Sequence, residues 1–149
     1  MKILIASDHA GLELKNQIAE ALRKTDAVED FGPFNSDSVD YPDYADFVCR
    51  RIQSDDASAK LTAFGILICG SGQGMALRAN KYPFVRAALV YSDEITQMAR
   101  EHNNANIICI GARFTDFEKA LKWVQIFKQT AFAGGRHQTR VAKIHSSIP

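Results

Sequence analysis

The segment Phe64-Gly65-Ile66-Leu67-Ile68-Cys69-Gly70-Ser71-Gly72-Gln73-Gly74-Met75 decides how this chain is interpreted. Its first half is a continuous apolar run, which is typical of a strand in the middle of a parallel sheet. The run ends at a thiol, Cys69, and three glycines follow at alternate positions. Glycines permit unusual φ angles and the close approach of a ligand, so we expect N–H groups of this turn to converge on an anion. The alternative is a tight turn in which the buried thiol is only a spacer.

Length and composition limit the possible functions. The 149 residues, of which 46% are hydrophobic, suit one domain over residues 1–149 with a full core. A net charge of +1 gives no long-range attraction for nucleic acid or an anionic membrane. No apolar run approaches the ~18 residues that span a bilayer, and a strand begins at once, which leaves no room for a signal peptide. We therefore expect a cytoplasmic protein.

The three cysteines, Cys49, Cys69 and Cys109, are odd in number and have no close pairing. This argues against a disulfide framework and against a zinc site. Cys49 lies in a helical pattern and Cys109 in a strand pattern, so we expect both to be small core residues.

Four further stretches predict strands, at residues 2–7, 28–31, 85–90 and 106–111, and the signal at 28–31 is the weak one. Helical patterns alternate with them, and a last helix carries Arg136 and Arg140. This alternation predicts an α/β fold: a three-layer α/β/α, Rossmann-like domain with a five-stranded parallel sheet and a C-terminal helix. The pattern does not give the strand order.

Local signals place several helix ends. Pro42 suits the first turn of a helix whose buried side includes Phe47, and Ser92 is a predicted N-cap. Thr115 and Glu118 have the spacing of a capping box. Asn103 and Asn104 suggest a left-handed end to the helix before them.

Polar residues follow the first strand and precede the second helix. Asp8 and His9 come directly after the first strand, and strand ends in open α/β sheets are where ligands bind. Asp40 and Tyr41 lie at the start of the helix at Pro42. A purely structural interpretation stays open for each: Asp8 and Asp40 as caps, His9 as a turn residue and Tyr41 as a packing residue.

The reactive candidates are Cys69, His102 and Asp8, and the candidates for binding an anion are the glycine turn, His9, Arg113, Arg136 and Arg140. Arginine forks match phosphate oxygens, and N–H groups of the turn suit an oxyanion, so the set indicates a small phosphorylated substrate. A thiol beside such donors is available as a thiolate base or nucleophile. The glycine spacing fits neither a phosphate loop nor a dinucleotide fingerprint, and no cluster has metal-ligand spacing.

These residues fall in motifs that resemble the ribose-5-phosphate isomerase B family, which includes the subunits of galactose-6-phosphate isomerase. In order, the motifs are Ser7-Asp8-His9-Ala10-Gly11, Asp40-Tyr41-Pro42, Cys69-Gly70-Ser71-Gly72-x-Gly74, Ala79-Asn80-Lys81, His102-Asn103, Gly111-Ala112-Arg113 and Gly134-Gly135-Arg136-His137. The resemblance covers nearly the whole chain. A variant of the family has a glutamate base after the last glycine of the turn; here that position is Met75, so the chain resembles the cysteine type.

The resemblance implies reversible isomerisation of ribose 5-phosphate and ribulose 5-phosphate through an enediolate, with no metal and no other cofactor. It assigns Cys69 as the base that moves the carbon-bound proton and His102 as the group that helps to open the furanose ring. Ser71 would assist proton movement between oxygens, and Asp8 would orient hydroxyls or the ring-opening proton path. The other implied substrate contacts are His9, Arg113, Arg136 and Arg140 at the phosphate, Asn103 at sugar oxygens, Tyr41, and Gly70, Gly72, Gln73 and Gly74 of the turn.

The order of elements predicts how the chain assembles. Asp8 and Cys69 lie at carboxyl ends of strands, whereas His102 and Asn103 precede a strand and so belong to the opposite edge of the sheet. One subunit could not easily bring them together. The resemblance implies a homodimer whose partner chain supplies His102 and Asn103, and leaves pairing into a tetramer open.

Two other functions stay open. The same motifs serve an isomerase of a six-carbon phosphosugar, galactose 6-phosphate or allose 6-phosphate, because only the sugar length differs. A sugar-phosphate-binding protein without turnover would keep the arginines and the glycine turn but would not need Cys69 and His102.

Overall fold

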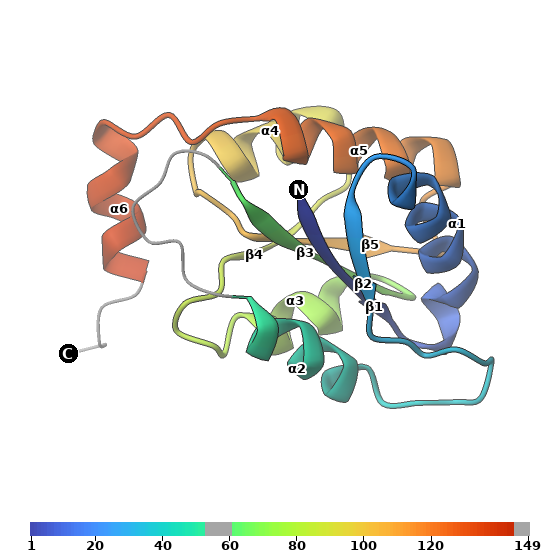
Figure 1. Cartoon of the computed structure of the whole chain (residues 1–149). Helices are drawn as coiled ribbons and strands as arrows, with labels where there is room; N and C mark the ends of the chain where they lie inside the picture. The colour runs from blue at the N-terminus through green and yellow to red at the C-terminus, as the bar shows by residue number, and fades with distance from the viewer. Residues whose placement is uncertain (53–60, 145–149) are drawn as a thin grey trace.

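The structure, a computed structural model, describes residues 1–52 and 61–144. Its strands and helices alternate along the chain (Figure 1). In order they are β1 Lys2–Ser7, a 3-10 turn His9–Gly11, α1 Leu12–Arg23, β2 Ala27–Asp30, α2 Tyr41–Arg51, β3 Ala63–Cys69, α3 Gln73–Ala79, β4 Ala87–Leu89, α4 Asp93–Glu101, β5 Ile107–Gly111, α5 Phe117–Gln129 and α6 Arg136–Ile144.

The five strands form one parallel sheet in the order β2-β1-β3-β5-β4. This confirms the predicted α/β class and the five-stranded parallel sheet. The predicted stretch at residues 85–90 contributes only the three residues of β4 to the ladder. Val85 and Val90, which suggested a longer strand, are buried on either side of it.

Alternate side chains of the strands fill two separate cores. Ile3, Ile66 and Ile108 point to the face that α1, α4 and α5 cover. Leu4 and Leu67 point to the face that α2 and α3 cover. This alternation is what a pleated strand covered on both sides requires, and Figure 1 shows the resulting three layers.

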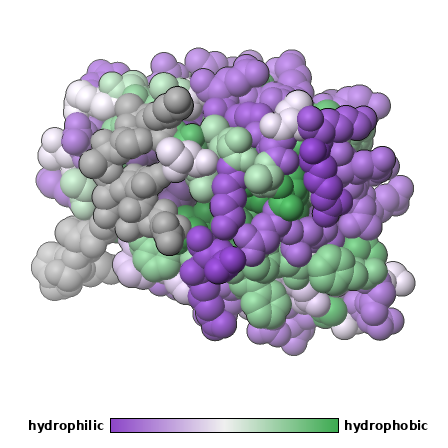
Figure 2. All heavy atoms as spheres, viewed as in Figure 1, coloured by the Kyte–Doolittle hydropathy of each residue, from purple (hydrophilic) through white to green (hydrophobic). Residues whose placement is uncertain are grey.

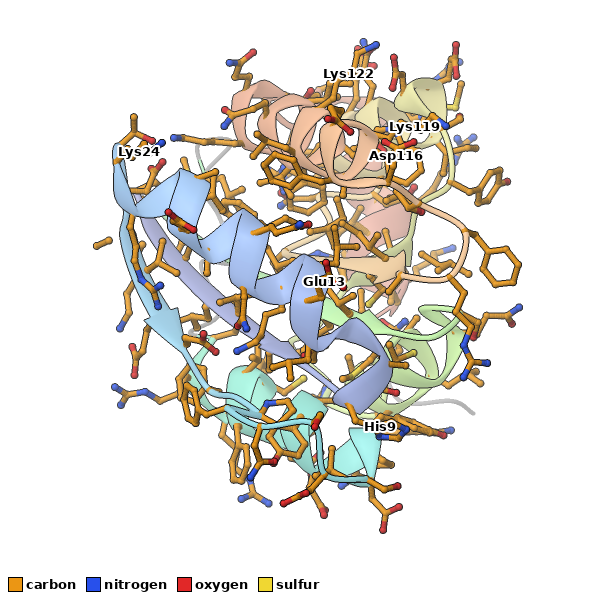
Figure 3. All side chains as sticks on the ribbon, turned by 90° about the vertical axis from the view of Figure 1, so that its right-hand side faces the viewer. His9, Glu13, Lys24, Asp116, Lys119 and Lys122 are labelled. Carbon is orange, nitrogen blue, oxygen red and sulfur yellow. The ribbon has the colours of Figure 1, made fainter. Side chains whose placement is uncertain are left out.

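Most predicted helix ends are confirmed. Ser92 caps α4 by accepting a hydrogen bond at Oγ from the N–H of Ile95 (3.2 Å), and Asn104 after α4 has a φ of +47°. The capping box predicted from Thr115 is wrong, because α5 begins one residue later. Asp116 is the N-cap, with its Oδ1 accepting from the N–H of Lys119 at 2.9 Å, and Figure 3 shows these two residues side by side at the start of the helix.

The buried side of α2 differs from the prediction at Phe47 and includes a charged residue. Phe47, expected on the buried side, is 44% exposed, whereas Asp46 is buried and forms two 2.7 Å hydrogen bonds with the guanidinium of Arg78 on α3. On the other side of the sheet, the fully buried Lys15 pairs with Asp30 at 2.8 Å. Figure 2 shows that the surface in this view is mostly hydrophilic, with hydrophobic side chains interspersed.

The outer edge of β4 is covered at Ala87 by a side chain. The amide of Asn80 donates to the carbonyl of Ala87 and accepts from its N–H, both at 2.9 Å. Because Ala87 has both backbone groups satisfied in this way, its edge offers no free pair for another strand.

The last helix, α6, stands apart from the three layers (Figure 1). None of its residues is buried. The chain before it is fixed to the end of α4, where the N–H of Ala133 donates to the carbonyl of Glu101 at 3.0 Å.

Candidate active site

The sheet order creates a ligand-binding position between β1 and β3. β2 lies on one side of β1 in the sheet, and β3 lies on the other, so the connections diverge between β1 and β3. In open α/β sheets, ligands bind at the carboxyl ends of the strands next to such a divergence. The N–H of Asp8 donates to the carbonyl of Ile68 at 3.0 Å. Asp8 and Cys69 therefore lie side by side at the carboxyl edge of the sheet, the edge at which its parallel strands end.

The thiol of Cys69 has a backbone donor. The residue is 4% exposed, and the N–H of Gly72 donates to its Sγ at 3.1 Å. Gly72 has a φ of +76°, and a Cβ there would lie 2.6 Å from Cδ1 of Leu89 and 2.9 Å from the carbonyl carbon of Ile110. Glycine suits this turn because a Cβ would be strained and crowded there, and the turn directs an N–H at the sulfur.

The other two cysteines are in different surroundings. Cys49 and Cys109 are fully buried core residues, as predicted. Burial raises the pKa of the Cys49 thiol to about 12 and also raises the pKa of Cys109 well above its usual value. Both thiols therefore stay protonated at neutral pH, and Cys69 is the candidate nucleophile or base.

The turn after Cys69 uses part of its donors internally. Gly72 points its N–H at the sulfur, and the N–H of Gln73 lies 3.4 Å from Oγ of Ser71. Within the described part of the chain, the N–H groups of Ser71 and Gly74 make no hydrogen bond. Ser71 and Gln73 have exposed side chains. Two backbone donors and a hydroxyl therefore stay available to a ligand beside the thiol.

Asp8 acts as a cap and still has a free oxygen. Its Oδ1 accepts from the N–H of Gly11 at 2.9 Å, as the structural interpretation predicted. Its Oδ2 makes no hydrogen bond among the residues that the structure describes. The cap fixes the carboxylate beside β3, so the structural role and a role in the site are compatible.

His9 lies beside the loop that leads into α2 (Figure 3). The N–H of Val39 lies 3.3 Å from Nδ1 of His9. A ring nitrogen that accepts from an N–H carries no proton, so this contact assigns the proton of the neutral imidazole to Nε2. The exposed ring can then donate from Nε2 to an anion.

Tyr41 and Arg113 border the glycine turn. A Cβ on Gly74 would lie 2.6 Å from Cζ of Tyr41, and a Cβ on Gly70 would lie 3.2 Å from Nε of Arg113. The N–H of Arg113 also donates to the carbonyl of Gly70 at 3.1 Å. Both side chains thus lie against the turn, with Tyr41 38% exposed.

The remaining predicted residues lie at the opposite edge of the sheet. Gly65 pairs with Ile107 and Cys69 with Gly111, so β5 runs beside β3 for four residue steps, about 13 Å at ~3.3 Å per residue. His102 is the C-cap of α4 and precedes β5. Within one chain, His102 and Asn103 therefore lie away from Cys69. This separation is the one that the order of elements predicted.

A second group forms around His102. Its ring stacks on that of His137, with centroids 4.4 Å apart and planes 4° apart. This contact places α6, with the exposed Arg136 and Arg140, beside His102. The guanidinium of Arg100 fixes the segment after His102, because its Nη1 donates a hydrogen bond to Oδ1 of Asn104 at 2.8 Å.

A cavity of about 440 Å³ adjoins this second group. It lies between β4, α4 and the end of α6, and its polar lining comes from Asn80, Arg86, His102 and Asn103. The predicted site residues are thus divided into two half-sites. We call the group of Asp8, His9, Tyr41, the turn 69–74 and Arg113 the thiol half-site, and the group of His102, Asn103, Arg136 and Arg140 the histidine half-site.

Two features of these half-sites were not predicted. His137 belongs to a motif that was identified in the sequence, but no role was assigned to it, because only the structure brings α6 to His102. The contact between Val39 and His9 joins residues 30 positions apart and has no local signal. Among the described residues, no three His, Cys, Asp or Glu side chains gather as metal ligands would, and no helix is long and apolar enough to cross a membrane.

Comparisons with known proteins agree on one family. The model of the family described as Ribose/Galactose Isomerase matches residues 3–144. A probable ribose-5-phosphate isomerase B of Mycoplasma pneumoniae is 43% identical over 144 residues, covering 95% of this chain and 91% of the relative.

Solved structures give the same result. A ribose 5-phosphate isomerase from Thermotoga maritima is 46% identical, with a TM-score of 0.88 and 96% of each chain covered. Ribose-5-phosphate isomerase B from Mycoplasma genitalium, solved with bound ribulose-5-phosphate, is 43% identical, with a TM-score of 0.89 and coverage of 97% of this chain and 93% of that one.

Proposed function

The chain belongs to the ribose/galactose isomerase family, and on that premise we propose that it interconverts ribose 5-phosphate and ribulose 5-phosphate. The observation that carries the proposal is the backbone donor on Cys69, 3.1 Å from the sulfur, at the point where the sheet connections diverge. A base that moves a proton between two carbons must lie beside donors for the oxyanion that forms. The thiol half-site places the sulfur of Cys69 next to the backbone donors of the turn.

The carbon chemistry centres on Cys69. Its thiolate takes the proton from C2 of the open-chain aldose, and the electrons of that bond form the C1–C2 double bond of an enediolate. The N–H groups of Ser71 and Gly74, which make no hydrogen bond within the described chain, hold the negative oxygen. The thiol then returns the proton to C1, while the hydroxyl of Ser71 carries a proton between the two oxygens.

Ring opening precedes this step and uses the other half-site. His102 gives a proton to the ring oxygen as the bond between that oxygen and C1 breaks. The C1 hydroxyl loses its proton to Oδ2 of Asp8, and C1 becomes the aldehyde carbon. His102 lies at the C-terminal end of α4, a position at which helices favour positive charge.

The phosphate would be held from both half-sites. Nε2 of His9 and the guanidinium of Arg113 lie on the thiol side, and Arg136 and Arg140, four residues apart on α6, lie on the histidine side. Asn103 would bind sugar oxygens, and the ring of Tyr41 would border the sugar. Gly70, Gly72 and Gln73 would contribute through the backbone of the turn, in which the N–H of Gly72 lies on the sulfur and that of Gln73 lies 3.4 Å from Oγ of Ser71.

This division supports a homodimer with shared sites. Cys69 and His102 lie at opposite edges of one sheet, so a complete site needs the histidine half-site of a second chain. The exposed α6 gives a second reason. A helix of nine residues without a buried face is marginal alone, and a partner chain that covers it would stabilise it.

The first experiment measures ketose formation from ribose 5-phosphate after treatment with a chelator. We expect activity in the parent and a loss of about 10²–10⁴-fold in Cys69→Ala, the range for removal of a general base. Cys49→Ala is the matched control, since it removes a protonated core thiol and should leave turnover largely intact. A folded Cys69→Ala protein with parental activity would contradict the role of the thiol, and a parent inactive on ribose 5-phosphate would contradict the substrate.

A six-carbon phosphosugar is the second candidate, because the matched family also includes galactose isomerases. The enediolate chemistry is the same for both sugar lengths. The comparison of kcat/KM for ribose 5-phosphate, galactose 6-phosphate and allose 6-phosphate decides between them.

A further inference from the structure

Two histidine rings form a stack in the histidine half-site. The imidazoles of His102 and His137 are parallel to within 4°, and their centroids are 4.4 Å apart. Planar rings at this distance are in face-to-face contact. The stack therefore fixes the plane of the His102 ring relative to α6.

The backbone around both residues is held in place. The N–H of His102 donates to the carbonyl of Met98 at 2.9 Å, and that of His137 donates to the carbonyl of Gly134 at 3.0 Å. The hydrogen bond from Ala133 to Glu101 joins the two segments at 3.0 Å. The rings meet because the two chain segments are fixed to each other, and not through a chance contact of two mobile side chains.

The charges around His137 favour its neutral form. Loss of solvent around the ring lowers the pKa of His137, and the neighbouring His102 lowers it next. The positive charges of Arg136 and Arg140 act in the same direction, whereas Glu101 acts weakly in the opposite one. A neutral His137 lets His102 take a proton without placing two parallel cations face to face.

The stack leaves the reactive edge of His102 open. The N–H groups and lone pairs of an imidazole lie in the plane of the ring, whereas the stack occupies one of its faces. Within the described part of the chain, the His102 ring makes no hydrogen bond. The contact with His137 can thus orient both nitrogens without occupying either of them.

We propose that His137 is a positioning residue for ring opening, which holds the His102 imidazole in the plane from which it protonates the ring oxygen. This inference rests on the proposed function. His137 itself takes no proton from the substrate in this role. The step is the one described above: the ring oxygen gains a proton from His102, the C1–oxygen bond breaks, and the C1 hydroxyl loses its proton to Asp8.

Two variants test whether His137 acts through its flat ring or through its ability to take a proton. His137→Phe keeps a flat ring for the stack but cannot be protonated, and His137→Ala removes the ring. Gln138→Ala, at an exposed neighbouring position of α6, is the control for general effects on this helix. Circular dichroism and the thermal midpoint of each variant check that the fold is kept.

The two directions of the reaction separate ring opening from carbon chemistry. Ribulose 5-phosphate cannot close a furanose ring, because its C5 oxygen carries the phosphate, so its conversion starts from the open chain. We expect His137→Ala to lower kcat from ribose 5-phosphate about tenfold to hundredfold, the cost of a misplaced catalytic group. It should leave kcat from ribulose 5-phosphate within about threefold, since Cys69 chemistry is untouched. His137→Phe should restore most of the loss, and Gln138→Ala should match the parent.

Other results would overturn the proposal. An unchanged kcat from ribose 5-phosphate in a folded His137→Ala protein would remove the positioning role. An equal fall of kcat in both directions, or a rise in KM alone, would mean that His137 acts in substrate binding. If the parent converts neither sugar phosphate, the proposed function fails and this inference fails with it, whereas an active parent with unaffected variants contradicts only the inference.

Discussion

The turn that follows Cys69 gives a quantitative prediction for Gly72→Ala. At a φ of +76°, an alanine pays a left-handed backbone cost of about 1–2 kcal/mol. Its Cβ would also lie 2.9 Å from the carbonyl carbon of Ile110 and 3.0 Å from the backbone nitrogen of Gly111, and such overpacking adds about 1–3 kcal/mol. We expect the free energy of unfolding to fall by about 2–5 kcal/mol in total.

Gly134→Ala is the matched control for the backbone cost alone. Gly134 has a φ of +62°, but a Cβ there would meet no atom within 4 Å, so its loss should be about 1–2 kcal/mol. Urea unfolding at one fixed protomer concentration measures both variants, and equal m values would allow the midpoints to be compared. Gly72→Ala should also lose turnover, because the turn must shift the N–H that lies on the sulfur. If the two variants lose the same stability, the steric reasoning is wrong.

Two further predictions concern charge and assembly. Arg78 holds the pKa of Asp46 below its usual value of 3.8, so this carboxylate contributes stability that is complete above about pH 4 and is lost as the pH falls through the lowered value. Asp46→Asn should therefore lower the urea midpoint at pH 7 more than at pH 3, and an equal difference at both would contradict the assignment. For assembly, inactive Cys69→Ala mixed with inactive His102→Ala should regain activity as subunits exchange, since one site in a mixed dimer has both groups intact. No recovery after exchange has been verified by mass would count against shared sites.

Much of the fold could be predicted because its signals are local. The apolar run at residues 64–69 became β3 with one more residue at its start, and Ser92 became a cap, since both depend on neighbours in sequence. The strand order depends on which helices share a face of the sheet, and no short segment carries that information. The length of β4 also depended on its surroundings. Val85 is buried, but its N–H donates to the carbonyl of Tyr82 in the preceding turn, and Val90 follows β4 with its N–H on the carbonyl of Cys109.

Charged residues in the core were beyond sequence reasoning. Lys15 lies on α1 and is fully buried, and Asp30 on β2 pairs with its ammonium group there. On α2, Phe47 is exposed and Asp46 is buried, the reverse of what hydrophobicity predicts. The reason is similar, since Arg78 on α3 donates two hydrogen bonds to the buried carboxylate of Asp46. A pattern of hydrophobicity treats each charge as exposed and cannot include a partner that is distant in sequence.

The candidate site was predicted as a set of residues but not as a geometry. The thiol half-site follows from strand ends, and its position agrees with the sequence reasoning. The chain that supplies each arginine could not be predicted. The structure places Arg113 against Gly70 and places Arg136 and Arg140 on the helix beside His102. The roles of these residues and the single domain over residues 1–149 stay predictions.

The amide of Asn80 on Ala87 has a consequence for how copies of this chain can join. An uncovered edge strand is a template on which further strands add, and repeated addition leads to open-ended fibrils rather than to a closed pair. With this end of the sheet occupied by a side chain of the same molecule, growth by backbone pairing at Ala87 is blocked. At Ala87, association is left to side-chain surfaces, which a two-fold axis can close.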